Sequence, residues 1–565
     1  MQPPPVTGTR DERPRRRPRR TPGRIPWLRS RRAPRGAPAG APVGGAAPGA
    51  VPPGAAVPGA ARPGTAVSGS ARAGWAARAV PHGPAAVAVL FTLVQLTLVV
   101  PGSGLGWDET VYVSQVSSHA PAAFFSAPRA RGISYLAAPV AALTDAVPPL
   151  RVWLALLSGA GLFLALRVWR GLLPAAVLTL AGGLFAGLWV TLFYGPQVMP
   201  NLWVALGALF ATGCLLRALR DPASRWAPAG VCAGVALTAL MRPSDALWLA
   251  LPLGAALLLV RSWRRPLLLA ALAAGGALGS AEWIAEAYTA YGGPAARLRR
   301  ASEIQGHLAP YFSVDDHIRA LGGRTLCRPC DVPWRNPATG LWWFALPLLA
   351  TGGVLAARRT RYRAEILLPA LAGLGLALPY LFLVGYAAPR FLLPAYALLS
   401  LPVAHGLLRL THRVRVARPR LRPAAAALSV TVLGLHLAVQ FTVLDSTLTS
   451  FRHNGATLDR MAAELGRQGV RPPCVVSGPD AVRIAFRAGC SSRQVGGHDG
   501  SITHAALRAA AETRPVAVLV TNGAEPPPYA RAWRSRPLPD LGPWRFRAYL
   551  SPAARPDTGP VTARD

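Results

Sequence analysis

Long apolar runs recur along the chain from about residue 84 to about residue 444. Several of them, such as "AAVAVLFTLVQLTLVV" and "AAALSVTVLGLHLAVQFTVL", approach the roughly 20 residues that an α-helix needs to cross a bilayer. Short polar turns separate these runs. The pattern predicts a mostly α-helical, polytopic membrane protein.

The turns between the runs indicate the orientation, because arginine gathers on the cytoplasmic side of membrane proteins. Turns such as "RVWRGL", "RALRDPASR" and "AARRTRYR" fall on one side if the chain begins inside and crosses eleven times. The segment "GISYLAAPVAALTDAVPP" is short and bounded by proline, so we expect it to lie along the outer interface. This scheme predicts a multi-pass protein of the cell membrane with a cytoplasmic N-terminus and an extracytoplasmic C-terminal part.

Two segments of different character flank the apolar region. Residues 1–78 are rich in arginine, proline, alanine and glycine, and this composition predicts a disordered cytoplasmic tail. Residues 445–565 lack long apolar runs, but "PPCVVSGPDAVRIAFRAGC" and "RPVAVLVTNG" have the pattern of short buried strands with helices between them. We therefore expect a tail, a membrane domain over 84–444 and a small α/β domain.

Four of the six cysteines stand in pairs. Cys474 and Cys490 flank the first strand–helix unit of the C-terminal domain, where they either pair in an oxidising compartment or remain buried thiols. Cys327 and Cys330 form a CxxC motif in a long outer loop. A zinc site would need two further ligands, so a local disulfide or free thiols are the better interpretations.

Composition agrees with a membrane protein. Charged residues make up 15% of the chain, whereas soluble domains contain about 25%, and the mean hydropathy is +0.30. The net charge of +37 comes from arginine, since lysine is absent, and the excess of arginine, alanine, glycine and proline suggests a GC-rich genome. The arginines are scattered among loops, which argues against nucleic-acid binding. The basic tail is suited to contact anionic membrane lipids.

Two adjacent carboxylates follow the first apolar run in a chain that is poor in acid. The stretch "GLGWDETVYVSQ" places Asp108 and Glu109 where the chain has just left the membrane. On their own they would also suit a solvated loop next to an interfacial tryptophan. Two arginines follow in "SAPRARG", however, and "APRFLLPAYALLSLP" places Arg390 at the outer end of the tenth run. Acidic and basic groups are thus expected at the same membrane face.

These motifs and the topology resemble the GT-C superfamily of integral membrane glycosyltransferases, which includes the protein O-mannosyltransferases and the aminoarabinose transferase of lipid A. The superfamily has a "DE…Y" motif in its first extracytoplasmic loop, matched here by Asp108, Glu109 and Tyr112. A late "R-[YF]-L-L-P" turn is matched by Arg390 and the four residues after it. The resemblance covers about residues 84–444.

The resemblance implies transfer of a sugar from a polyprenyl-phosphate donor to an extracytoplasmic acceptor, which would be a cell-envelope glycan, lipid or protein. Such a transfer needs a carboxylate to take the acceptor's proton, and this implies Asp108 as the base with Glu109 in support. Arg390 would bind the departing phosphate, because a guanidinium meets phosphate oxygens bidentately. Arg129 and Arg131 are weaker candidates for the same role.

Further candidates for acceptor-binding or supporting groups are Tyr112, Asn201 and Glu282. Asn201 stands where many relatives have a second acidic residue, and an amide cannot act as an anionic metal ligand. A mechanism that depends on a divalent cation is therefore disfavoured, unless Glu282 or Glu286 supplies the carboxylate. Arg242 in "MRPSD" suits a snorkelling interfacial arginine better than a phosphate ligand.

Two other classes of function are alternatives. A polytopic transporter would usually show internal repeats or charged residues in mid-membrane, and neither is clear here. The other alternative is a non-catalytic membrane protein of the cell envelope with an altered site. The early acidic pair favours the glycosyltransferase.

Overall fold

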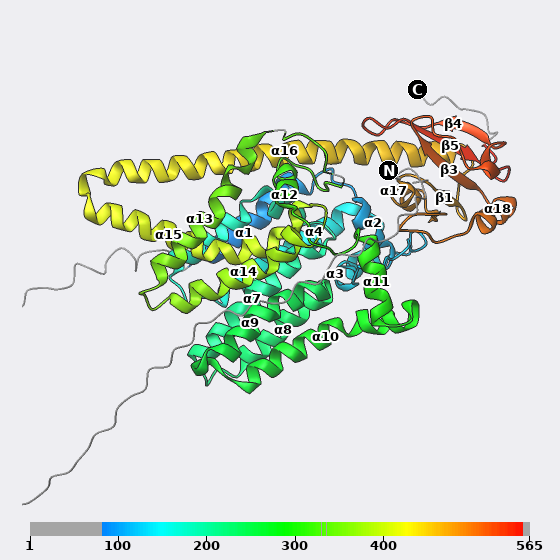
Figure 1. The fold of residues 1–565 in the computed structure, drawn as a ribbon. Coiled ribbons are helices and arrows are strands. Elements are labelled where there is room, and N and C mark those ends of the chain that lie inside the picture. Colours follow the sequence, from blue (N-terminus) through cyan, green and yellow to red (C-terminus); the bar gives the residue numbers. More distant parts are fainter. Residues whose placement is uncertain (1–81, 329, 335, 557–565) are drawn as a thin grey trace, which may run out of the picture. The chain divides into compact units, whose positions relative to one another are not determined.

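The computed structural model describes residues 82–328, 330–334 and 336–556 (Figure 1). The described chain is mostly helical and has one small β-sheet near its C-terminal end. The tail expected over residues 1–78 lies outside the described residues. For the rest of the chain, the predicted fold class of a polytopic helical protein with a C-terminal α/β domain is confirmed.

Seven helices of the described chain are long and apolar enough to cross a membrane. Five shorter apolar helices have 10–17 residues each. One of them, α3 (Gly132–Ala141), is the segment predicted to lie along the interface, and the other four lie where the remaining four of the eleven spans were predicted. The eleven are α1 (Gly83–Val94) with its π-helical extension η1 (Gln95–Val99), α4 (Val147–Arg167), α5 (Ala175–Ala186), α7 (Pro200–Arg220), α8 (Trp226–Met241), α9 (Pro243–Leu259), α10 (Pro266–Tyr291), α13 (Leu341–Ala357), α14 (Arg363–Phe382), α15 (Leu393–Ala417) and α16 (Arg422–Arg467).

Proline sets several helix boundaries. It occupies the first turn of α4, α7, α9 and α10, where its missing N–H would have no partner within the helix. A residue before proline is pushed out of the helical region, and Arg242 before Pro243 has an extended backbone with φ of −156°. Spans α8 and α9 are therefore separated by a break of one residue at Arg242.

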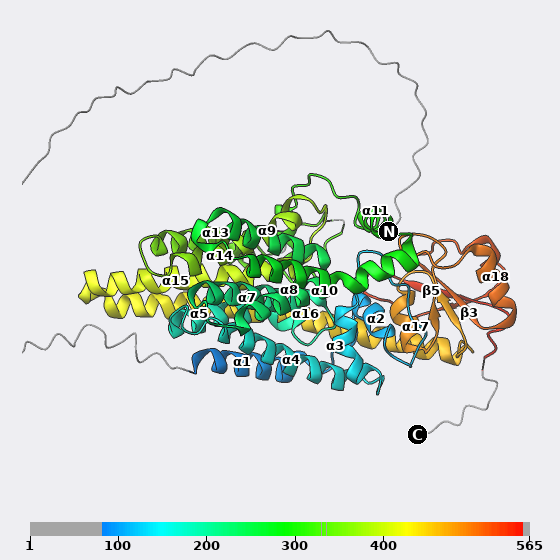
Figure 2. The ribbon, with the colours of Figure 1, turned by 90° about the horizontal axis from the view of Figure 1, so that it is seen from below.

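The helices of the bundle differ in how deeply they are buried. The apolar windows of α7 and α15 are 83% and 78% buried inside the protein, whereas that of α16 is 17% buried. Helices α7 and α10 lie beside α8 (Figure 2). Glycines allow these helices to approach closely. A Cβ on Gly279 of α10 would lie 2.2 Å from the carbonyl oxygen of Ala236 in α8. The core of the bundle is thus formed by α7 and α15, with α8 held tightly beside α10.

Short helices occupy the connections between the spans. Helices α2 and α3 follow the first span, and α11 follows α10 (Figure 1). The short elements are α2 (Trp107–Ser114), α6 (Trp189–Tyr194), α11 (Pro294–Ile304), α12 (Val314–Ala320) and the 3₁₀ helices η2 (Arg261–Trp263), η3 (Pro337–Gly340), η4 (Pro389–Leu392) and η5 (Pro419–Leu421), whereas η6 (Pro528–Ala530) lies in the C-terminal domain.

The C-terminal domain contains a five-stranded sheet with the order β2–β1–β3–β5–β4. Strand β1 is parallel to β2 and β3, whereas β5 is antiparallel to β3 and β4. The elements are β1 (Val475–Ser477), α17 (Ala481–Arg487), β2 (Ser491–Ser492), α18 (His504–Thr513), β3 (Val516–Thr521), β4 (Arg534–Pro537) and β5 (Phe546–Leu550).

Helix α16 belongs to both the bundle and the C-terminal domain. Its last turns place Leu458, Met461 and Leu465 in the core of the sheet domain. The helix runs without interruption through the boundary expected at residues 444 and 445. A single rigid element therefore connects the membrane-spanning part to the sheet.

Both cysteine pairs of the sequence form disulfides in the structure. Cys474 and Cys490 join the residue before β1 to the residue before β2, and so tie two neighbouring strands together. Cys327 and Cys330 close a tight loop between α12 and α13. The sequence left a disulfide and free thiols open for each pair, and the structure has the disulfide in both.

Candidate active site

The two adjacent carboxylates lie in the first turn of α2 and point in different directions. Glu109 accepts a hydrogen bond from the backbone N–H of Gly106 at 2.8 Å, which caps the helix. It is 1% exposed and forms an ion pair with Arg151 of α4. Neighbouring helical residues are about 100° apart around the axis, so Asp108 faces elsewhere, with 32% of its side chain exposed.

Asp108 is held between two arginines from distant parts of the sequence. Its Oδ1 accepts a hydrogen bond from Nη2 of Arg129 at 2.7 Å, and its Oδ2 accepts one from Nη2 of Arg390 at 2.9 Å. Burial raises the pKa of Asp108, but attraction by Arg129 and Arg390 outweighs burial and holds the pKa below its ordinary value of 3.8. The carboxylate is therefore ionised at neutral pH.

Arg129 comes from the loop between α2 and α3. Its Nη1 donates a hydrogen bond to Oγ of Ser126 at 2.6 Å, and its guanidinium lies 5.1 Å from the ring centroid of Trp107 and 5.8 Å from that of Tyr112. The backbone carbonyl of Arg129 accepts a hydrogen bond from Arg297 of α11 at 3.0 Å. Cation–π contacts and backbone support thus orient the guanidinium toward Asp108.

Arg390 lies in η4, directly before α15. Its Nη1 donates a hydrogen bond to the carbonyl of Thr325 at 2.7 Å and a longer one to the hydroxyl of Tyr194 at 3.3 Å. The guanidinium lies 5.4 Å from the ring centroid of Phe391. Nη1 of the guanidinium is therefore held by Thr325 and Tyr194, and Nη2 is directed at Asp108.

These side chains line a cavity of about 510 Å³. Its charged and polar lining includes Asp108, Glu109, Tyr112, Arg129, Tyr194, Asn201, Arg242, Arg328, Arg390, Arg483, His498 and Asp499. The described lining residues include five arginines and three carboxylates. Glu109 pairs with Arg151, Arg242 with Asp245 and Arg483 with Asp480, all outside the lining, which leaves three arginines and two carboxylates. The excess of positive charge suits an anionic ligand.

Comparison with solved structures identifies the fold that carries this cavity. The crystal structure of ArnT from Cupriavidus metallidurans bound to undecaprenyl phosphate matches with a TM-score of 0.59 and 12% identity, over 85% of this chain and 100% of that chain. Its apo state matches with a TM-score of 0.57 and 12% identity, over 84% and 99% of the two chains. ArnT is a GT-C glycosyltransferase. The protein has a GT-C fold. No family model matches the sequence, and no curated protein matches it significantly.

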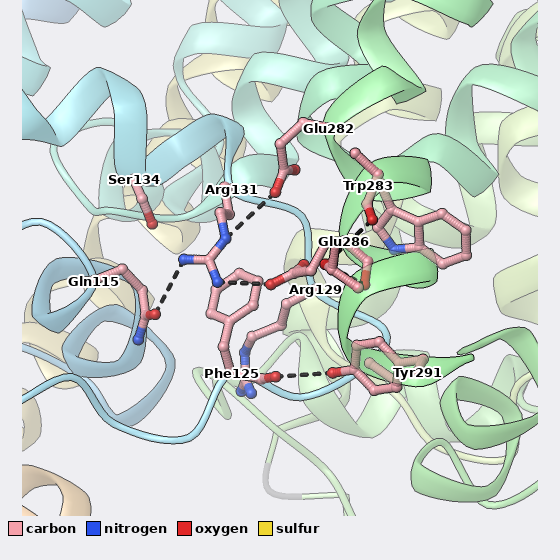
Figure 3. A network of polar contacts seen from close by, with 12 residues as sticks. Gln115, Phe125, Arg129, Arg131, Ser134, Glu282, Trp283, Glu286 and Tyr291 are labelled. Atoms are coloured by element: carbon pink, nitrogen blue, oxygen red, sulfur yellow. Dashed lines mark hydrogen bonds and ion pairs between the residues drawn. The ribbon is translucent and has the colours of Figure 1, made fainter. Parts of the chain in front are cut away.

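Within this GT-C fold, Arg131 and Glu282 lie in a second polar network and do not line the cavity (Figure 3). Arg131 pairs with Glu286 at 2.6 Å and with Glu282 at 3.3 Å, and its guanidinium stacks on the ring of Phe125. Arg297 binds the other oxygen of Glu286 at 2.7 Å. This network fastens the α2–α3 loop to α10 and α11, so a direct contact of Arg131 with donor phosphate has no support in the geometry.

Asn201 lies in the first turn of α7 and lines the cavity of the GT-C fold. It is fully buried, and neither its side-chain oxygen nor its nitrogen has a hydrogen-bond partner among the described residues. Glu282 and Glu286, the carboxylates expected as substitutes for an acid here, are paired with arginine. Among the residues that the structure describes, no group of three or more His, Cys, Asp or Glu side chains is placed to hold a metal ion.

The sequence did not indicate the roles of two arginines near the cavity of the GT-C fold. Arg151 is fully buried and pairs with Glu109. Its position at the start of the second apolar run, at the same membrane face as the acidic pair, could have indicated this pairing. Arg242 was expected to snorkel, yet it lines the cavity and lies 5.4 Å from the ring centroids of both Tyr380 and Phe391. The proline after Arg242, which breaks the helix there, could have indicated this position.

Proposed function

We propose that the protein is a membrane glycosyltransferase that transfers a sugar from a polyprenyl phosphate to a hydroxyl or amine acceptor outside the cytoplasm. The observation that carries this proposal is the ionised Asp108 between Arg129 and Arg390 in a cationic cavity. The similarity in fold to ArnT, whose structure was determined with undecaprenyl phosphate bound, supports it.

The arginines have enough donors to bind the donor phosphate and Asp108 together. A guanidinium has five N–H donors in a fork that matches phosphate oxygens, and Asp108 occupies one nitrogen of each arginine. A phosphate bound at Arg390 would compete with Asp108 for the positive charge of this arginine. The attraction between Arg390 and Asp108 would then be weaker. Donor binding would thus raise the basicity of the carboxylate that has to accept a proton.

The proposed transfer is a single displacement at the anomeric carbon. The acceptor gives its proton to Asp108, and its oxygen or nitrogen forms a bond to the sugar. The bond between that carbon and the phosphate oxygen breaks, and its electron pair leaves with the polyprenyl phosphate. Arg390, with Arg129, stabilises the negative charge that develops on the phosphate.

In the cell we propose a multi-pass membrane protein with a cytoplasmic N-terminus and an extracytoplasmic C-terminal domain. The exposed leucines of the outer helices would contact membrane lipids, among them Leu251 of α9, Leu278 of α10 and Leu435 of α16. The proposed domains are the tail over 1–78, the membrane domain over 84–444 and the α/β domain over 445–565, with α16 shared by the last two.

The test is the rate of sugar transfer from radiolabelled polyprenyl-phosphate sugars in membranes with matched amounts of protein. Asp108→Asn is nearly isosteric and should lower the rate by about 10²–10⁴-fold, the usual contribution of a general base. Asp145→Asn is the matched control, because Asp145 lies in the same connection between spans and does not line this cavity. Full activity of Asp108→Asn would show that Asp108 is not the base. Label that never leaves the donor in wild type would instead favour a transporter or a non-catalytic protein.

A further inference from the structure

We infer that the disulfide-closed loop at Cys327 and Cys330 is a positioning element that holds Arg390 in place for the donor phosphate. The inference rests on the proposed function, since it concerns the residue that would bind the donor. The CxxC motif has no part in the proton transfer or in the bond cleavage described above.

The loop is joined directly to the segment that leads into Arg390. The backbone N–H of Cys327 donates to the carbonyl of Ala387 at 2.8 Å, and the N–H of Ala387 donates to the carbonyl of Cys327 at 3.2 Å. This reciprocal pair forms an isolated antiparallel bridge. Ala387 is three residues before Arg390, so the disulfide-bonded Cys327 fixes the backbone from which the guanidinium extends.

A second contact holds the guanidinium itself. The carbonyl of Thr325, two residues before Cys327, accepts the 2.7 Å hydrogen bond from Nη1 of Arg390. Among the described residues, Arg390 also donates hydrogen bonds to Asp108 and Tyr194. A backbone carbonyl can orient an arginine only if its own chain segment is held, and here that segment ends at the disulfide.

The disulfide takes the place of regular secondary structure in this region. Between α12, which ends at Ala320, and η3, which begins at Pro337, the described residues form no helix and no strand apart from the bridge. Cys327 is 2% exposed and packs in a small cluster with Ala320 and Ala387, against which Cys330 lies. A covalent link across so short a loop restricts the backbone at Cys327. Thr325 is separated from this restrained end by a single residue.

The test compares two variants that each lack one disulfide. In the purified full-length protein, Cys327→Ser/Cys330→Ser should raise the dissociation constant for undecaprenyl phosphate by about tenfold, a loss of ~1.4 kcal/mol. It should also raise KM for the donor more than it lowers kcat. Cys474→Ser/Cys490→Ser, the control, removes a disulfide that does not contact Arg390 and should leave the dissociation constant within about twofold of wild type.

Combination with Arg390→Leu separates positioning from general stability. If the disulfide acts through Arg390, its removal from Arg390→Leu should weaken binding no further, because the side chain it positions is gone. An equal loss in both backgrounds would overturn the inference. If Cys327→Ser/Cys330→Ser does not fold, dithiothreitol can be added to the folded Cys474→Ser/Cys490→Ser variant. It reduces the remaining disulfide to two thiols and is itself oxidised to its cyclic disulfide, and donor binding should then weaken in the same way.

The same measurements separate the failure of this inference from that of the proposed function. If wild type does not bind undecaprenyl phosphate and Asp108→Asn changes no transfer, the proposed function is wrong, and the inference falls with it. If wild type binds and Arg390→Leu weakens binding, but Cys327→Ser/Cys330→Ser binds as wild type does, the inference alone is wrong.

Discussion

Glu109 and Arg151 form a buried ion pair, and we expect its loss to affect stability more than chemistry. Arg151 is fully buried, and besides Glu109 it donates hydrogen bonds to the carbonyls of Gly104 and Pro196. Glu109→Gln keeps the shape of the side chain but leaves the buried guanidinium without its counter-ion, which typically costs ~3–5 kcal/mol. The thermal unfolding midpoint should fall, while the transfer rate per folded molecule changes little.

The double variant Glu109→Gln/Arg151→Met is the control for this pair. Removal of both charges leaves no uncompensated buried cation, so part of the lost stability should return. A Glu109→Gln protein with the stability of wild type and no transfer would contradict the assignment, and the base would then be Glu109 instead of Asp108.

The pH dependence of transfer should reflect the lowered pKa of Asp108. Because Arg129 and Arg390 outweigh burial, this pKa lies below 3.8, and the carboxylate is ionised at every higher pH. Asp108 should therefore produce no acid limb in kcat/KM for the donor above about pH 4. Arg129→Leu removes one attracting charge, so its acid limb should appear at higher pH. Identical profiles of kcat/KM against pH in the two proteins would argue against Asp108 as the base.

The sequence predicted the direction of a side chain where helix geometry alone determines it. Asp108 and Glu109 are adjacent on a helix, so their divergence could be predicted without any structure. The partner of each could not, because Arg390 and Arg151 reach the pair through tertiary packing. Arg131 illustrates the same limit, since it lies two residues from Arg129 and nevertheless faces α10.

At the scale of helices, the contact between α8 and α10 depends on glycine. A Cβ on Gly279 would lie 2.2 Å from a backbone oxygen of α8, whereas a Cβ on Gly276, one turn earlier in α10, would meet open space. Gly279→Ala should destabilise the protein by about 1–3 kcal/mol through overpacking, and Gly276→Ala should not. Thermal unfolding of the two variants in detergent measures the difference. Equal midpoints would show that the helices can separate at no cost.

Hydropathy predicted the helices better than it predicted their ends. The apolar runs and arginine turns indicated eleven spans, because bilayer thickness sets their length. The end of α16 was not predictable in the same way, since the helix continues for more than twenty residues beyond its last apolar run. There its buried residues follow a helical period and pack against the sheet. A change of surroundings from lipid to protein therefore does not mark the end of a helix.

At the scale of the whole chain, the cavity is assembled from segments that are far apart in the sequence. Its lining combines Asp108 of α2, Asn201 of α7, Arg390 of η4 and residues of the C-terminal domain such as His498 and Asp499. The motifs in the first loop and before the tenth span indicated two of these segments. No local pattern distinguishes His498 or Asp499, because they reach the cavity only through the docking of the sheet domain.

The sheet domain lines the proposed site, where transfer would occur outside the cytoplasm. The sheet domain should therefore lie on the outer side of the membrane. The connection between α15 and α16 should then lie inside, because only the span of α16 separates it from the domain. We expect a cysteine at Ala524, in the exposed loop after β3, to react with an impermeant maleimide on intact cells. A cysteine at Arg420, exposed between α15 and α16, should react only after the membrane is made permeable. Wild type controls for the native thiols, and equal labelling of both variants on intact cells would refute the orientation.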